Sequence, residues 1–248
     1  MKFAVCINHV PDTATKVHVG PDGKSIEKTG VNYVISPYDE YAVEAGLRFK
    51  EKQTGEVVVL SWGGDAHKES LRKALAMGVD KAVLLKDDST RDSFGVARAL
   101  ADYLRELAPD VILFGKQSVD YDDSAVGIMV AEMLGLPSAA VVVSMEITGG
   151  TAKADREIEG GHEVVEVQLP AVFTIQKGAY EPRYPSLKGI MAAKGKPIEE
   201  RQPAPMEAKM ETITMVKPPA KQAGKIVGTD VGAVPELVRL LHEEAKVI

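Results

Sequence analysis

The sequence predicts an α/β fold: a doubly wound, mostly parallel sheet, followed by an antiparallel β extension and a C-terminal arm. Buried-strand and helical patterns alternate as far as about residue 137, which is typical of a parallel sheet with helices on both faces. From residue 139 onward, extended segments follow one another with no helix between them. Residues 180–232 contain seven prolines and little periodicity, which indicates an arm and not a second domain.

The first elements follow from apolar runs and turn residues. Residues 3–7 form a continuous apolar run, which predicts a strand buried on both faces. Residues 16–27 alternate around a Pro-Asp-Gly turn, which predicts a β-hairpin, and residues 31–35 form a short extended piece. Ser36 is expected to cap the next helix, with Pro37 at the first helical position.

The later elements alternate regularly and then change character. Short apolar runs predict buried strands, and stretches with apolar residues at helical spacing predict helices. Strands are expected at residues 56–62, 81–85 and 111–114, and helices at residues 65–77, 94–107 and 124–134. The β extension is expected to contain three strands, at residues 140–147, 163–169 and 171–176, and a short helix at residues 234–245 ends the chain.

Composition excludes several classes of protein. The chain has 248 residues and a formal net charge of −6, and this acidic balance disfavours a nucleic-acid partner. Its one cysteine, Cys6, excludes a disulfide framework and a multi-cysteine metal site. No apolar run approaches the roughly 18 residues of a membrane span, and no targeting segment is evident. We therefore expect a cytoplasmic protein without direct membrane insertion.

The ends of the predicted strands form the expected ligand site. In an open parallel sheet, ligands bind outside the carboxyl ends of the strands. The loops at those ends are residues 6–8, 62–64 and 115–120. Their glycines allow close backbone approach, and the helix N-termini that follow offer free N–H groups to an anion. This pattern favours a nucleotide phosphate, although a dinucleotide G-x-G-x-x-G fingerprint and a P-loop are both missing.

Several residues near these loops have two interpretations. The acidic cluster of Asp120, Asp122 and Asp123 either holds Mg²⁺ or complements the dipole of the next helix, and the second interpretation is favoured. Cys6 is expected to be a small core residue and not a nucleophile. Trp62 either packs on a ligand base or fills the rim of the sheet. The histidines lack metal-ligand spacing, and His67 is expected at the surface.

Two long motifs resemble the signature of the β subunit of electron transfer flavoproteins. One is residues 154–163, continuing to residues 169–172, and the other is residues 181–187, followed by Ile190 and Met191. Residues 36–40, 74–78 and 115–117 agree with the family in the same order, as does Asp120. The chain departs from the family at Phe173, where a smaller aliphatic is usual, and at Ser36, where many members have Asn.

The resemblance implies an adenine-nucleotide α-hydrolase-like fold and a carrier subunit that is not an enzyme by itself. The implied partners are an electron transfer flavoprotein α subunit, flavin-dependent dehydrogenases and a quinone oxidoreductase. The implied cofactors are AMP on this subunit and FAD mainly on the α subunit. The resemblance also implies two parts of the chain. Residues 1–179 form a nucleotide-binding domain with its β extension, and residues 180–248 form a docking loop with a C-terminal arm.

The resemblance also implies the site residues. The segment at residues 180–196 resembles the family's recognition loop, in which Leu187 is the apolar anchor for a partner pocket; the alternative is that Leu187 packs on its own subunit. The arm beyond residue 203 is expected to wrap the α subunit. The implied AMP contacts are Cys6, Ser36, Pro37, Tyr38, Asp39, Trp62, Gly115, Lys116, Gln117, Ser118, Val119, Asp120, Asp122, Asp123, Ser124, Ala125 and Val126. The implied docking residues are Tyr184, Leu187, Ile190 and Met191.

Two alternatives stand beside the AMP-binding carrier. Some members of the family bind a second FAD in place of AMP and bifurcate electrons, and Tyr121 is a bulky residue where we expect Gly in those members. AMP is therefore favoured. A stand-alone ATP-binding protein of the universal-stress type is the remote alternative. It would need a Gly-rich phosphate motif after the fourth strand, and it would leave the motif at residues 154–172 unexplained.

Overall fold

The computed structural model describes residues 1–221 and 223–248. The first half contains β1 (Lys2–Cys6), β2 (His9–Pro11), β3 (Tyr33–Ile35), α1 (Pro37–Gln53), β4 (Glu56–Gly63), α2 (His67–Met77), β5 (Lys81–Lys86), α3 (Ser93–Leu107) and β6 (Val111–Gly115). The second half contains α4 (Val126–Leu134), β7 (Ser138–Thr148), β8 (Thr151–Ile158), β9 (Gly161–Gln168), β10 (Ala171–Ile175), α5 (Leu187–Gly195), β11 (Ile198–Arg201), the 3₁₀ turn η1 (Val231–Ala233) and α6 (Val234–Glu243).

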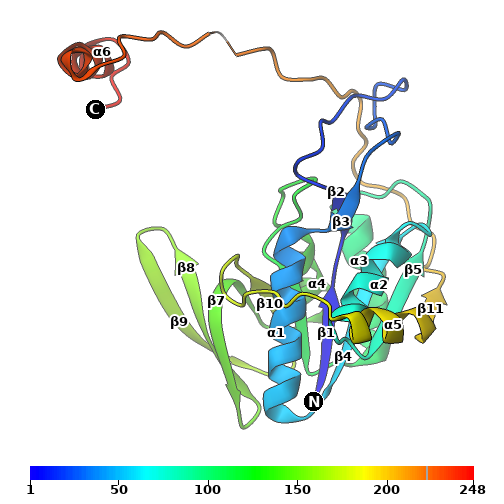
Figure 1. Ribbon diagram of the computed structural model, residues 1–248. Coiled ribbons are helices and arrows are strands. Elements are labelled where there is room, and N and C mark those ends of the chain that lie inside the picture. The colour runs from blue at the N-terminus through cyan, green and yellow to red at the C-terminus, as the bar shows by residue number, and fades with distance from the viewer. Residues whose placement is uncertain (222) are drawn as a thin grey trace.

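A nine-stranded sheet forms the body of the protein, in the order β11-β5-β4-β1-β6-β10-β7-β8-β9. The strands from β11 to β7 pair in parallel, and β8 and β9 continue the sheet antiparallel (Figure 1). Helices α1, α2 and α5 contribute to the apolar core on one face, and α3 and α4 to the core on the other. The doubly wound fold class is therefore confirmed.

Strand β10 differs from the expectation. It lies between β6 and β7 and pairs in parallel with both, so placing residues 171–176 in the antiparallel extension was wrong. All five residues of β10 are buried, as a central parallel strand requires. Phe173 is fully buried there, so its ring is core variation, as expected.

The antiparallel extension is a β7-β8-β9 ladder that projects from the body on one side (Figure 1). Strand β8 was not predicted from the sequence, because its charged residues, such as Lys153 and Arg156, obscure the alternation. Glycines at positive φ close the turns before and after it, at Gly149, Gly150 and Gly160.

The region expected as a hairpin at residues 16–27 contains only an isolated bridge between Val19 and Ile26. The regular pairing nearby joins β2 and β3 in a small two-stranded sheet, so residues 31–35 are extended as expected. Ser36 occupies the N-cap position of α1 and Pro37 its first turn, but the Ser36 side chain makes no capping bond.

The C-terminal part begins on the body and then leaves it. Helix α5 packs on α2, and β11 adds to the sheet edge beside β5; both lie beyond the predicted division at residue 180, which stays a prediction. Residues 204–215 still contact the body: Arg91 Nη2 donates to the Ala204 carbonyl, and the backbone N–H of Met215 donates to the Gly23 carbonyl. Helix α6 lies far from the sheet (Figure 1). Within the described ranges, no helix combines the length and apolar character needed to cross a membrane.

Candidate functional site

Asp39, in the first turn of α1, ties together the ends of two central strands. Its Oδ2 accepts a hydrogen bond of 2.8 Å from the backbone N–H of Asn8, just after β1. Its Oδ1 accepts one of 3.0 Å from the backbone N–H of Gly115, the last residue of β6. Burial raises the pKa of Asp39 to about 7, against the opposing effect of these two hydrogen bonds. The carboxyl ends of β1 and β6 therefore meet the N-terminus of α1 at one edge of the sheet.

Hydrogen bonds from polar side chains, within the loop between β6 and α4 and from Asn8 after β1, hold this loop in place. Asn8 Nδ2 donates to Ser118 Oγ at 2.9 Å and to Asp120 Oδ2 at 3.0 Å. Gln117 Nε2 donates to Asp122 Oδ1 at 2.7 Å, and Ser124 Oγ donates to Gln117 Oε1 at 3.3 Å. Asn8 lies in the strand-end loop that was expected at the ligand site, but it was not among the contact residues implied by the resemblance.

The acidic cluster is engaged in these local contacts. Asp123 accepts hydrogen bonds from the Ser93 hydroxyl and from the backbone N–H of Ala125, beside the start of α4. No group of metal-ligating side chains is found among the described residues. Asp123 therefore lies where a complement to the helix start would lie, and the choice between this role and Mg²⁺ stays a prediction. Helix α4 has no side-chain cap at its N-terminus, which leaves its first N–H groups available to an anion.

Two polar atoms near this edge are buried without a partner in the described part of the chain. They are Ser36 Oγ and Trp62 Nε1. Such atoms are rare because an unpaired buried donor or acceptor costs about 1–3 kcal/mol. Trp62 packs beside the α3–α4 core. The Arg91 guanidinium carbon lies over the Trp62 ring, 5.8 Å from the ring centroid. Trp62 thus packs on the protein at the rim of the sheet, and its contact with a ligand base stays a prediction.

Cys6 and His67 line the buried side of the same edge. Cys6 is buried, and burial with the nearby Asp39 raises the pKa of its thiol, which fits a core residue. His67 is half-buried, where the sequence predicted a surface residue. Its Nδ1 lies 2.8 Å from Ser61 Oγ, and burial next to His9 lowers its pKa to about 4. Its ring packs against Gly63, where a side chain would collide with it.

A cleft joins the predicted nucleotide residues to the predicted docking residues. Its volume is about 470 Å³. Pro37, Tyr38 and Val119 line one side, and Tyr184 with Pro185 lines the other. The remaining lining residues include Lys73 and Lys177 as well as Glu40 and Glu181, so the cleft offers charges of both signs around an aromatic surface.

The predicted docking residues form an exposed apolar face. Tyr184 is 95% exposed, Leu187 84% and Met191 67%. Ile190 is also exposed. Leu187 opens helix α5, whose N-cap Ser186 accepts a hydrogen bond from the backbone N–H of Gly189. The alternative in which Leu187 packs on its own subunit is wrong, because so exposed a side chain has no core around it.

Gly115 is required by the approach of α1 to β6, and not only by a ligand. A Cβ at this position would lie 2.5 Å from Asp39 Oδ1 and 2.6 Å from the Tyr38 carbonyl carbon. We therefore expect Gly115→Ala to lower the free energy of unfolding by about 1–3 kcal/mol or more. Gly161→Ala is the control, since nothing lies within 4 Å of a Cβ there. Equal urea midpoints for the two variants would contradict this account.

Asp39 makes stability depend on pH. Its folded pKa of about 7 exceeds the ordinary 3.8 of the unfolded chain, so between those values only the folded state keeps the proton. The contribution of this group to the free energy of unfolding therefore falls as pH rises from about 4 to 7, by at most about 4 kcal/mol. Urea denaturation of wild type and Asp39→Asn at pH 5 and pH 7.5 measures the change. We expect the wild type to gain less free energy of unfolding over Asp39→Asn at pH 7.5 than at pH 5. The same pH dependence of this free energy in both proteins would exclude a buried, protonated Asp39.

Comparison with known proteins identifies the family. The model of the electron transfer flavoprotein domain matches residues 24–206. A Syntrophomonas wolfei protein named electron transfer flavoprotein subunit beta is 44% identical, over 90% of this chain and 88% of its own length. Proteins of the same name from Bacillus subtilis and Bradyrhizobium diazoefficiens are 39% and 38% identical, with both chains covered in full. The chain therefore belongs to the electron transfer flavoprotein family and is similar along its length to the beta subunits of these electron transfer proteins.

Proposed function

We propose that this chain is the β subunit of a heterodimeric electron transfer flavoprotein. In this role it binds AMP as a structural ligand, supports an α subunit that holds most of the FAD, and docks flavin-dependent dehydrogenases. The electrons then pass to a quinone oxidoreductase. The chain is a carrier subunit and not an enzyme by itself. Family membership supports electron transfer, and the subunit names of the relatives support a partner chain.

The observation that carries the nucleotide proposal is the strand edge organised by Asp39. Its bonds to Asn8 and Gly115 bring α1, β1 and β6 together, and most of the implied contact residues lie on these elements or on the loop after β6. The unpartnered Ser36 Oγ and Trp62 Nε1 are polar atoms that an adenosine could satisfy. AMP would supply a phosphate charge and an adenine ring that fill this edge without reacting.

The phosphate would be held by the loop before α4. The uncapped helix N-terminus offers backbone N–H groups from Val126 onward, and Gln117, Ser118 and Ser124 add neutral polar groups. Lys116 is the nearby cation. The carboxylates of Asp120 and Asp122 already accept hydrogen bonds from Asn8 and Gln117, which limits their repulsion of a phosphate.

The C-terminal arm supports an α partner. Its apolar side chains at Met210, Ile213, Val216 and Ile226 are exposed. Helix α6 is strongly amphipathic in sequence, yet Val234 and Leu237 on it are also exposed, and it lies far from the sheet (Figure 1). Exposed apolar area of this extent is typical of a surface that a partner covers.

The bifurcating alternative is not excluded by Tyr121. Its side chain is 74% exposed, so its bulk lies in solvent and not inside the loop. An exposed side chain can still project into the space that a second FAD would need, so the preference for AMP stays a prediction, and the nucleotide content decides between the two cofactors.

The test of the nucleotide proposal is to co-express the chain with the α subunit, denature the heterodimer and quantify the released nucleotides. We expect one FAD and one AMP per heterodimer. Two FAD and no AMP would support the bifurcating alternative. A chain that forms no heterodimer and binds ATP alone would reject the proposed function.

The docking proposal is tested at Leu187, whose side chain protrudes from the start of α5. We expect Leu187→Ala to raise the KM of the partner dehydrogenase for the heterodimer by about five- to thirtyfold, because loss of a central apolar anchor costs about 1–2 kcal/mol. The flavin content should stay at the wild-type level. The matched control is Val164→Ala, an exposed apolar residue on β9. Unchanged partner kinetics in Leu187→Ala would remove the docking role.

A further inference from the structure

The docking segment, defined as residues 180–196, is held to the body at both ends while its apolar side chains face outward. The exposed residues Tyr184, Leu187 and Met191 lie between the two attachments. Each attachment combines apolar packing, by Tyr180 against Phe49 at one end and by the buried Ala193 at the other, with hydrogen bonds from an arginine side chain. The arginine contacts are the polar part of this support.

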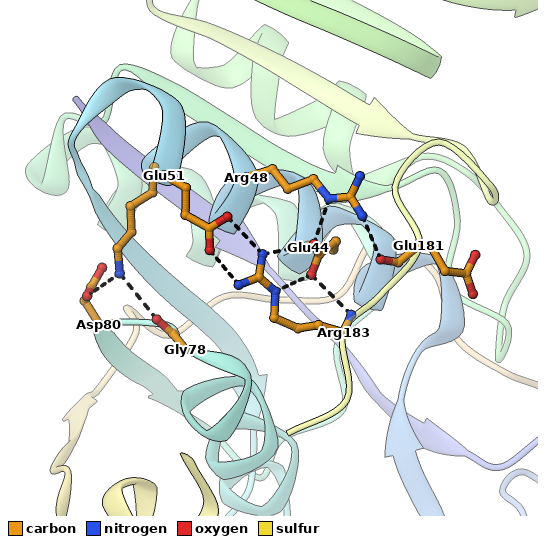
Figure 2. A network of polar contacts seen from close by, with 8 residues as sticks. Glu44, Arg48, Glu51, Gly78, Asp80, Glu181 and Arg183 are labelled. Carbon is orange, nitrogen blue, oxygen red and sulfur yellow. Dashed lines mark hydrogen bonds and ion pairs between the residues drawn. The ribbon is translucent and has the colours of Figure 1, made fainter. Parts of the chain in front are cut away.

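The first attachment is a buried carboxylate on α1. The Glu44 side chain is only 3% exposed. Its Oε2 accepts hydrogen bonds from Arg183 Nε at 2.8 Å and from the Arg183 backbone N–H at 3.2 Å, and its Oε1 accepts one from Arg183 Nη2 at 3.1 Å (Figure 2). Arg48 Nε donates a further bond of 2.8 Å. Burial alone would raise the pKa of Glu44, but the bonds from Arg183 and Arg48 lower it below its ordinary value.

The same guanidinium also reaches a second carboxylate on α1. Arg183 donates to Glu51 through Nη1 at 2.6 Å and Nη2 at 3.2 Å. Glu44 and Glu51 are seven residues apart, so they lie on one face of the helix, about 10 Å apart along its axis. Figure 2 shows Arg183 between the two carboxylates. The planar Arg183 guanidinium binds both carboxylates, so a shift of residue 183 would break several charge-assisted hydrogen bonds at once. These bonds therefore fix the direction of the chain at this residue.

The second attachment holds the other end of the segment on α2. Arg72 Nη1 donates to the carbonyl oxygens of Ala193 and Lys196, both at 2.5 Å. Lys196 Nζ donates to the carbonyl of Val79 at 2.7 Å. Gly189 packs so closely on the Ala76 carbonyl that no side chain would fit there. Helix α5 is therefore seated on α2, and the path leading into it is fixed at Arg183.

Rigid support matters for a docking face of this size. A few apolar side chains make a small interface, and such an interface is weakened when segments must be ordered on binding. We propose that Arg183, clamped between Glu44 and Glu51, is a positioning residue that pre-orients the apolar face around Leu187 for the partner dehydrogenase. This inference rests on the proposed docking function. The partner meets Leu187, and Arg183 acts only through the orientation that it imposes.

The substitution that tests this is Arg183→Lys in the co-expressed heterodimer. Lysine keeps a positive charge beside the buried Glu44 but offers one ammonium group, which cannot form paired bonds to both carboxylates. Glu51→Gln is a second variant that weakens the clamp at its exposed end and leaves Glu44 paired. Arg201→Lys is the matched control, because Arg201 on β11 pairs with Glu199 and not with Glu44 or Glu51. The partner is a flavin-dependent dehydrogenase that reduces the wild-type heterodimer.

Each variant is measured for KM and kcat with the dehydrogenase, for flavin content, and for flavin reduction by dithionite, which needs no partner. We expect Arg183→Lys to raise KM by about tenfold with kcat within about twofold, as for lost pre-organisation. Glu51→Gln should change KM in the same direction by a smaller factor. Arg201→Lys should behave as the wild type, and flavin content and dithionite reduction should match in all four proteins.

A double-mutant cycle separates positioning from a purely structural role. If Arg183 acts through Leu187, then Arg183→Lys should change KM by less than about twofold in the Leu187→Ala background. Equal effects of Arg183→Lys in both backgrounds, or a loss of flavin, would overturn the positioning role. So would a wild-type KM in Arg183→Lys and Glu51→Gln while Leu187→Ala is impaired. If Leu187→Ala itself is unimpaired, the docking function fails and the positioning role fails with it.

Discussion

The organisation of the candidate nucleotide site and of the docking segment depends on two buried carboxylates of helix α1. Asp39 joins the strand ends of the candidate nucleotide site, and Glu44 holds the base of the docking segment. They stand five residues apart on one helix, about 7.5 Å along its axis. The helix is pressed onto the sheet at Gly46, where a Cβ would lie 3.0 Å from Val5 Cγ2. The position of α1 on the sheet therefore sets the position of both sites.

The two carboxylates show how their partners decide the charge of a buried acid. Asp39 has only backbone N–H partners, and its pKa rises. Glu44 is equally inaccessible but has two guanidinium groups, and its pKa falls. The first can exchange a proton near neutral pH, whereas the second is a permanent ionic anchor. Asp39 can therefore lose its charge near neutral pH, whereas Glu44 keeps its charge and its ion pairs.

Much of the fold was predictable because apolar runs and helical spacing are local signals. The apolar runs at residues 3–7 and 111–114 predicted the central strands. The carboxyl ends of those strands predicted the edge of the candidate site. Strand β8 and the parallel position of β10 were not predictable. Charged residues obscure the alternation of apolar residues along β8. The position of β10 depends on its hydrogen-bonded pairing with β6 and β7, which lie elsewhere in the sequence. A local pattern cannot report which strand lies next to it.

The sequence by itself determined the class of fold and the family, since these rest on periodicity and long motifs, and it predicted the edge of the candidate site from strand-end loops. Only the tertiary structure decided which polar groups meet there. Asn8 contacts Ser118 across 110 residues of chain, and Arg183 contacts Glu44 across 139. The packing of α1 against the sheet and of residues 180–196 against α1 brings these pairs together. Contacts at such separations leave no local pattern, because their geometry exists only once the layers have packed.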